Sequence, residues 1–226
     1  PSSVDILRTA GQLRTFLRAV HTSPLNRHGV LYIPSPQLHA AERAYKIYFL
    51  PRVASEGPDA VPPPPLDVMW VWFLHRLAPE PYTKDCESAF GRIVGARESD
   101  PFCFDPNGSP ADAVCVGDPV YGSGAPEDPA VSVTCDIPGT AERQAAFLWQ
   151  VRWPEYDDDA FLADARDRYA RLLWLWRARR AFLVPTYDQD LMWHAHMSHP
   201  TAYVADCMRL CGRLIGHDDS FTDRSA

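Results

Sequence analysis

The sequence lacks the features that would assign a function directly. Its 226 residues contain no run of 18 apolar residues, so no membrane-spanning helix is expected. The formal net charge is −7, which argues against nucleic acid as the main partner, because phosphate binding needs concentrated positive charge. No glycine-rich phosphate loop, Gly-x-Ser-x-Gly nucleophile elbow or His-Glu-x-x-His zinc motif is present. The commonest signatures of nucleotide-binding proteins, serine hydrolases and zinc proteases are therefore missing.

Cysteine pairs with metal or redox spacing are also missing. None of the six cysteines forms a Cys-x-x-Cys pair. Cys103, Cys115 and Cys135 lie in one irregular stretch and could form a disulfide in a secreted protein. The chain has no apolar leader, so free thiols and a cytoplasmic location are expected, unless a targeting signal has been trimmed.

The composition is that of a folded protein, with 46% hydrophobic and 12% aromatic residues. Apolar spacing predicts a helix over residues 6–20, a second from Pro36 to about residue 50 and a long one over 157–180. Residues 97–139 are rich in Pro, Gly, Asp and Ser, and only a short run at 130–135 could form a strand. We therefore predict an all-α helical bundle with a long irregular insertion.

One stretch of the chain is matched by a second. Residues 67–99 align with 188–220 at an offset of 121 without a gap, and eleven of the 33 positions are identical. The identical pairs are Asp67/Asp188, Trp72/Trp193, His75/His196, Pro79/Pro200, Tyr82/Tyr203, Asp85/Asp206, Cys86/Cys207, Gly91/Gly212, Arg92/Arg213, Gly95/Gly216 and Ser99/Ser220. The match predicts an internal duplication with pseudo-twofold symmetry. We expect residues 1–226 to form a single domain of two fused halves: residues 1–96, an insertion or lid at 97–139, and residues 140–220.

The candidate chemistry centres on histidine and aspartate. On a helix starting at Asp188, His196 and His199 share a face with that carboxylate, since they are spaced at i, i+3. A pseudo-twofold axis would bring His75 to His196, so we predict a metal site at His75, His196 and His199. Imidazole and carboxylate ligands suit zinc, iron or manganese.

Further residues are expected to act beside this metal. Asp67 and Asp188 are predicted as partners of the histidines, and together with His194 they form the candidate catalytic set. Asp190 and His194 are spaced at i, i+4 on a different face of the helix. A helix break before Pro200 would redirect the imidazole before it, and the His217 segment could lend another ligand.

A structural interpretation of the same residues stands beside the catalytic one. Asp67 and Asp188 are placed to cap helices, and Pro79 and Pro200 to begin the next ones. Buried histidines hydrogen-bonded within the core would then need no metal. Residues 157–159, three aspartates, resemble a metal-diphosphate cluster, but a charge run at a helix start explains them as well.

The second block resembles the hallmark of a known family. Residues 183–200, LVPTYDQDLMWHAHMSHP, and the related residues 64–86 are similar to the motifs of the glycine-rich domain-containing protein-like family of plants and fungi. The resemblance covers most of residues 1–96 and 140–220. Phe73 departs from it, because the family usually has a second histidine there. The resemblance implies a helical fold and no particular chemistry.

Three functions remain open from the sequence. The first is a metal-dependent hydrolase, lyase or cyclase that acts on a small-molecule substrate, with neither nucleic acid nor membrane as a partner. The second is a non-catalytic protein-interaction module in which the repeated motifs are structural. The third is a terpene-cyclase-like enzyme, which requires residues 157–159 to face a deep apolar cavity.

Overall fold

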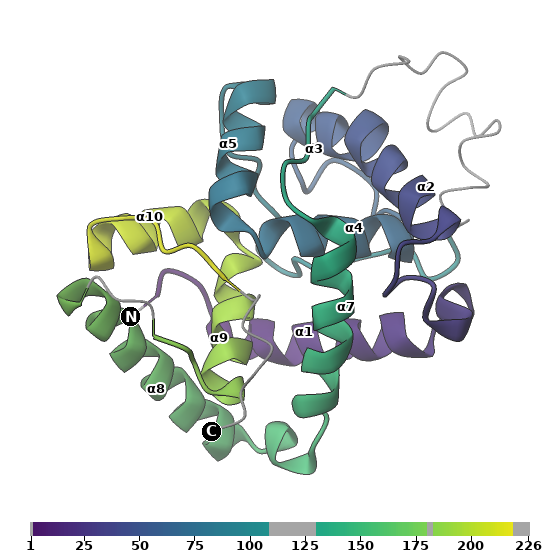
Figure 1. Cartoon of the computed structure of the whole chain (residues 1–226). Helices are drawn as coiled ribbons and strands as arrows, with labels where there is room; N and C mark the ends of the chain where they lie inside the picture. Colours follow the sequence, from purple (N-terminus) through teal and green to yellow (C-terminus); the bar gives the residue numbers. More distant parts are fainter. Residues whose placement is uncertain (1, 109–129, 180–182, 219–226) are drawn as a thin grey trace.

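The computed structural model describes residues 2–108, 130–179 and 183–218, and these residues form a helical protein (Figure 1). The helices are α1 (Ile6–Thr22), η1 (Pro24–Gly29), α2 (Pro36–Ala44), the π-helix η2 (Tyr45–Phe49), α3 (Leu50–Glu56), α4 (Leu66–Arg76), α5 (Pro79–Phe90), α7 (Ile137–Gln150), η3 (Pro154–Asp157), α8 (Asp159–Ala178), α9 (Tyr187–Met197) and α10 (Pro200–Cys211). No strand forms in the described ranges, where a single isolated bridge joins Pro65 and Asp105. The predicted all-α class is confirmed.

Two local expectations from the sequence are wrong. Residues 130–135 form no strand. The helices α4 and α9 are not capped by Asp67 and Asp188, because the residues at their N-caps are Pro65 and Thr186. Thr186 forms a reciprocal capping box with Gln189, which satisfies amide groups at the start of α9 and explains why the helix begins there.

The helix pairs α4–α5 and α9–α10 begin and end at positions that differ by 121 residues. Each pair is broken before a proline, at Ala78 (φ −110°, ψ 75°) and at His199 (φ −111°, ψ 75°). Each pair ends at a glycine in the left-handed region, Gly91 (φ 69°) and Gly212 (φ 73°), where a side chain would be strained. The same turn residues therefore produce the same backbone path twice.

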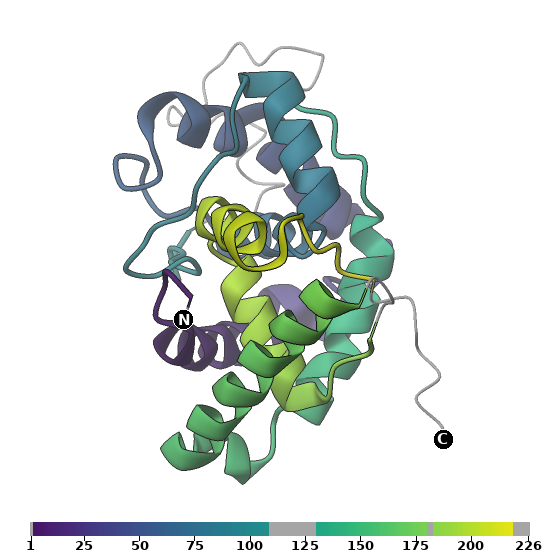
Figure 2. The same ribbon diagram turned by 90° about the vertical axis from the view of Figure 1, so that its left-hand side faces the viewer.

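The helices pack in two groups that share one core. In Figure 1, α2 to α5 occupy the upper part of the molecule, α1, α8 and α9 the lower part, and α7 runs between them. α9 packs against α1 and α8, and α4 packs against α2, α5 and α7. Seen from the side, α10 lies between α5 and α8, and it contacts both (Figure 2). α1 comes from the first part of the sequence but packs mainly against α9, so the two groups interlock.

One buried cation connects the two groups. The side chain of Arg76, at the end of α4, is almost fully buried and lies over the ring of Trp72. Its two terminal nitrogens donate to the carbonyl oxygen of Ser198 at 2.8 Å and to that of Pro101 at 3.0 Å. Burial lowers the pKa of Arg76 to about 10, so the guanidinium remains charged at neutral pH and holds α4 to the end of α9.

The cysteines of the described residues are unpaired, and none of the helices there could cross a membrane. Cys103 and Cys135 carry free thiols, as do the other three cysteines in the described ranges, and Cys115 lies outside those ranges. Within the same ranges, every helix is too short or too polar to cross a bilayer.

Candidate functional site

His75 is buried on α4 with both ring nitrogens in hydrogen bonds. Its Nδ1 lies 2.9 Å from the hydroxyl of Tyr45, and its Nε2 lies 3.2 Å from Oδ2 of Asp85. A carboxylate only accepts hydrogen bonds, so Nε2 carries the proton and Nδ1 accepts from the tyrosine hydroxyl. The neutral ring therefore satisfies both contacts in this arrangement.

His196, on α9, has the same surroundings. Its Nδ1 lies 3.0 Å from the hydroxyl of Tyr169, and its Nε2 lies 3.2 Å from Oδ2 of Asp206. The side chain is fully buried, as is that of His75. The two predicted metal ligands therefore each sit in a Tyr–His–Asp chain of hydrogen bonds in which no ring nitrogen is left to coordinate an ion.

The pKa directions agree with these proton positions. Burial lowers the pKa of His75 and of His196, and the neighbouring carboxylates only partly oppose it. Burial alone would raise the pKa of Asp206, but hydrogen bonds from His196, Arg209 and the backbone of Ser3 outweigh it and hold the pKa well below its usual range. The histidines are therefore neutral and the carboxylate charged at neutral pH.

Two segments outside the helices donate further hydrogen bonds to Asp85 and Asp206. The backbone N–H and the hydroxyl of Thr134, just before α7, donate to Asp85 at 2.8 and 2.9 Å. The backbone N–H and the hydroxyl of Ser3, just before α1, donate to Asp206 at 2.6 and 3.1 Å. Each aspartate thus connects a buried histidine to the segment before another helix through hydrogen bonds. This is a structural role.

The predicted catalytic carboxylates lie on other partners. Oδ2 of Asp67 accepts from Nε2 of Gln37 at 2.6 Å. Oδ2 of Asp188 forms an ion pair with Arg168 at 2.6 Å, and its Oδ1 accepts from the hydroxyl of Thr186 at 2.6 Å. The partners of the two histidines described above are therefore Asp85 and Asp206.

His199 is separated from His196 by the break before Pro200, as the sequence predicted. Its Nε2 lies 3.0 Å from the hydroxyl of Thr9 on α1. Burial, then the positive charge of Arg76, lowers its pKa to about 4. His199 thus joins α1 to the α9–α10 junction as a neutral side chain.

The three aspartates at 157–159 are exposed. Asp157 pairs with Arg14 at 2.6 Å, and Asp158 caps α8 by accepting from the amides of Ala160 and Phe161. The requirement of the terpene-cyclase interpretation, that these carboxylates face a deep apolar cavity, is not met.

One group of potential metal ligands does converge within the described residues. Asp190 and His194 on α9 meet His217, from the segment after α10, and one ligand atom of each lies within 4.8 Å of the others. The two Nε2 atoms of His194 and His217 are 3.1 Å apart. Oδ1 of Asp190 is 3.5 Å from His194 Nε2 and 3.8 Å from His217 Nε2. Of the predicted catalytic and metal-binding set, His194 belongs to this cluster, and His217 comes from the segment that was expected to lend a further ligand.

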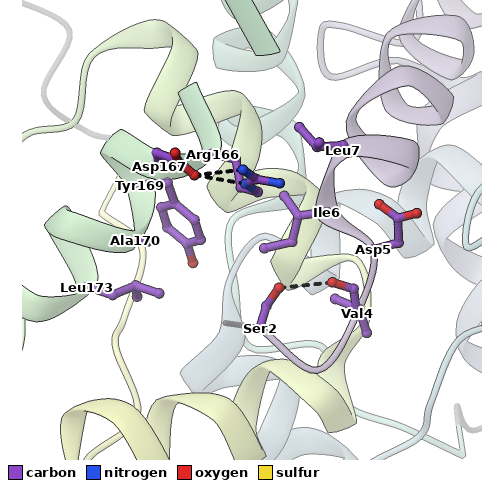
Figure 3. A pocket seen from close by; sticks show the side chains of 10 residues that line it. All are labelled: Ser2, Val4, Asp5, Ile6, Leu7, Arg166, Asp167, Tyr169, Ala170 and Leu173. Atoms are coloured by element: carbon purple, nitrogen blue, oxygen red, sulfur yellow. Dashed lines mark hydrogen bonds and ion pairs between the residues drawn. The ribbon is translucent and has the colours of Figure 1, made fainter. Parts of the chain in front are cut away.

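A cavity of about 470 Å³ lies elsewhere, between the start of α1 and the middle of α8 (Figure 3). Its walls include Val4, Ile6 and Leu173, with an ion pair between Arg166 and Asp167 at its edge. Tyr169 lines it too, and the hydroxyl of this tyrosine is the partner of His196 Nδ1.

Two plant proteins and one family model are similar to this chain. Glycine-rich domain-containing protein 2 of Arabidopsis thaliana is 33% identical over 255 residues, covering 99% of this chain and 30% of that protein. Glycine-rich domain-containing protein 1 of the same plant is 33% identical over 249 residues, covering 98% of this chain and 29% of that protein. A family model described as glycine-rich domain-containing protein-like matches residues 122–206. These matches confirm the resemblance of the chain to this family. It spans about 30% of the length of these relatives. No solved structure matches it.

Sequence reasoning did not identify Tyr45 and Tyr169 as the partners of the two histidines. Their offset is 124 rather than 121, so they fall outside the gapless alignment of the two blocks. Asp85 and Asp206 were recognised as a repeated pair but not as partners of the histidines. Their spacing of ten residues from His75 and His196 spans a helix break, and helical periodicity does not carry across such a break.

Proposed function

We propose that this domain is a non-catalytic protein-interaction module, built by duplication of one helical unit. The observation that carries the proposal is the use of every ring nitrogen of His75 and His196 in hydrogen bonds to tyrosine and aspartate. Those two histidines were the predicted ligands of a shared metal ion. Because both are fully hydrogen-bonded, a structural role for the repeated motifs is favoured.

The duplication is supported by contacts that recur at one offset. Nε1 of Trp72 donates to the hydroxyl of Tyr82, which donates to a backbone carbonyl, and Trp193 and Tyr203 do the same. These bonds, together with the His–Asp pairs, differ by 121 residues in both partners. Two unrelated helix pairs would seldom share so many side-chain contacts.

The surface that would contact a partner is formed by Trp149, in the last turn of α7, and by Arg152 and Trp153 just after it. The side chains of the two tryptophans are 62% and 48% exposed. The guanidinium of Arg152 lies over both rings, so the cation and the aromatic faces form one patch. Tryptophan and arginine are the residues most enriched among interface positions that dominate binding energy. We propose that this patch anchors a protein partner.

The test is affinity capture from an extract of the source organism, with quantification of the retained proteins. The double variant Trp149→Ala/Trp153→Ala is compared with Trp174→Ala, which removes a tryptophan that is 65% exposed on α8. We expect specific proteins to be retained by the wild type and by Trp174→Ala and to be depleted at least about tenfold by the double variant. No specific protein, or equal retention by all three, would contradict the proposal.

A second candidate function, an enzyme acting on a small molecule, is favoured by the cavity in Figure 3. It is of a size that small-molecule sites have, and Tyr169 connects it to the hydrogen-bond chain of His196. Leu173→Trp would fill the cavity. Small-molecule binding that is lost in Leu173→Trp, with no specific protein captured by the wild type, would favour this second candidate over the first.

A further inference from the structure

The cluster of Asp190, His194 and His217 is not explained by an interaction role. We propose that these three side chains bind one divalent transition metal ion, and that the ion is zinc. The site does not rest on the proposed function, and it differs from the metal site predicted at His75, His196 and His199.

The distances between the three ligand atoms fit a zinc ion. They are 3.1, 3.5 and 3.8 Å. A triangle with these sides has a point about 2.0 Å from all three corners, which is the length of zinc bonds to histidine nitrogen and carboxylate oxygen. Two imidazoles and a carboxylate are also ligands that zinc prefers. The three ligand atoms therefore lie at suitable positions for a zinc ion without rearrangement.

The proton on His217 is fixed by a neighbouring carbonyl group. Nδ1 of His217 lies 2.9 Å from the carbonyl oxygen of Leu77, at the end of α4. A carbonyl only accepts hydrogen bonds, so Nδ1 carries the proton and Nε2 of the neutral ring presents its lone pair to the cluster. A carbonyl or carboxylate that accepts from the other ring nitrogen orients most zinc-bound histidines and raises their basicity.

The surroundings shield the three ligand side chains from bulk water. The side chains of His194, His217 and Asp190 are 1%, 3% and 7% exposed. The ring of Phe147 packs on His194 at 4.4 Å between centroids, and that of Trp193 packs on His217 at 4.7 Å. Burial against aromatic rings strengthens the attraction between the carboxylate and a cation, and it leaves little room for a substrate. A structural ion fits this environment.

The cluster is specific to the second block. At an offset of 121 the first block has Met69, Phe73 and Ala96 in place of Asp190, His194 and His217. The first helix pair therefore folds to the same bounds without any of the three polar groups. A function that needs all three together, such as metal ligation, explains their joint presence in the second block.

An ion at this site would hold the segment after α10 in place. His217 would be joined to α9 through the metal and to the end of α4 through Leu77. Gly216 lies so close to α5 that an added Cβ would be 2.8 Å from Oε2 of Glu80. Since zinc would bind the folded chain alone, it would raise the free energy of unfolding with the logarithm of its free concentration above Kd.

The test uses the whole chain after removal of metals with a chelator. Zinc is titrated in competition with a chromophoric chelator, and cobalt is then used because its visible spectrum reports coordination number. We expect one equivalent to bind, a raised Tm and a four-coordinate cobalt spectrum, in which one water joins the three protein ligands. Asp190→Asn and His217→Gln should each weaken binding at least about 100-fold, and His39→Gln, which changes an exposed histidine, should not.

Folding of each variant is checked by circular dichroism and by the Tm of the metal-free protein. If a variant fails to fold, the stoichiometry and cobalt spectrum of the wild type still decide the question. Absence of saturable binding at one equivalent, a six-coordinate cobalt spectrum or wild-type affinity in a folded His217→Gln variant would overturn the proposal.

Discussion

The hydroxyl of Tyr169 lies 3.0 Å from Nδ1 of His196, and the same bond, at 2.9 Å, joins Tyr45 to His75. Both tyrosines and both histidines are buried, so each hydroxyl satisfies a nitrogen that has no access to water. The bond therefore determines which ring nitrogen carries the proton, and it removes that nitrogen from metal chemistry.

Removal of either hydroxyl should destabilise the fold. We expect Tyr169→Phe and Tyr45→Phe each to lower the free energy of unfolding by about 1–3 kcal/mol, because a buried ring nitrogen loses its donor. Urea denaturation measures the change. Tyr32→Phe is the control: its hydroxyl lies 3.4 Å from His21 in an exposed contact and also bonds Asn26, and the residue is only partly buried, so we expect a loss of about 1 kcal/mol or less. Equal effects at all three positions would contradict the account.

The threonine before α7 should matter in the same way. Its hydroxyl donates to Asp85, so Thr134→Val leaves the backbone bond and removes the side-chain bond. Hydrogen bonds to charged groups contribute about 1.5–3 kcal/mol, and we expect a loss in this range by urea denaturation. Thr15→Val is the control, since its hydroxyl bonds only a carbonyl of its own exposed helix turn. A loss at position 134 no larger than at position 15 would show that Asp85 does not hold this segment.

The buried arginine should not tolerate lysine. Nε of Arg76 donates to the carbonyl of Trp72, and its two terminal nitrogens reach carbonyls of Ser198 and Pro101. A lysine ammonium cannot span these directions. We expect Arg76→Lys to cost about 2–4 kcal/mol, since buried acceptors lose a charged donor. A thermal or urea unfolding curve that matches the wild type would contradict this role.

Stability should fall in mild acid. The folded pKa values of His75 and His199 lie below the unfolded value of about 6.5. Between the two values the unfolded chain binds more protons, so the stabilisation is complete above about pH 6.5 and is lost as the pH falls toward the folded values. We expect a lower urea midpoint at pH 5.0 than at pH 7.5 in metal-free protein.

His199→Gln should reduce this pH dependence, because one of the three buried histidines with a lowered pKa, His75, His196 and His199, is removed while a donor for Thr9 is retained. A midpoint that stays constant or rises between pH 7.5 and 5.0 in the wild type would show that these histidines are not held neutral by burial.

The sequence predicted local features better than contacts. Pro79 and Pro200 mark helix starts, and the helical class follows from apolar spacing, because both depend on neighbouring residues. The i, i+4 pair of Asp190 and His194 was placed on its own helix face for the same reason. Their third partner, His217, lies 23 residues beyond His194, and only the path of the chain after Gly212 brings it back.

The pairing of each histidine could not be read from the sequence for a related reason. Repeated residues indicate shared surroundings but not which residues touch. Asp67 and Asp188 lie on the same helices as His75 and His196, which favoured them as partners. The partners found, Asp85 and Asp206, belong to the next helices, and the angle at each helix junction decides that contact.

We propose that His75 and His196 are structural and that His194 and His217 are the metal-binding histidines. Side-chain ¹H–¹⁵N NMR of the imidazole groups, recorded during a zinc titration of the metal-free chain, tests both parts in one measurement. We predict that His75 and His196 remain neutral with the proton on Nε2 and do not change, and that the Nε2 signals of His194 and His217 move until one equivalent is added. Zinc-dependent shifts at His75 or His196, with His194 and His217 unchanged, would contradict the account.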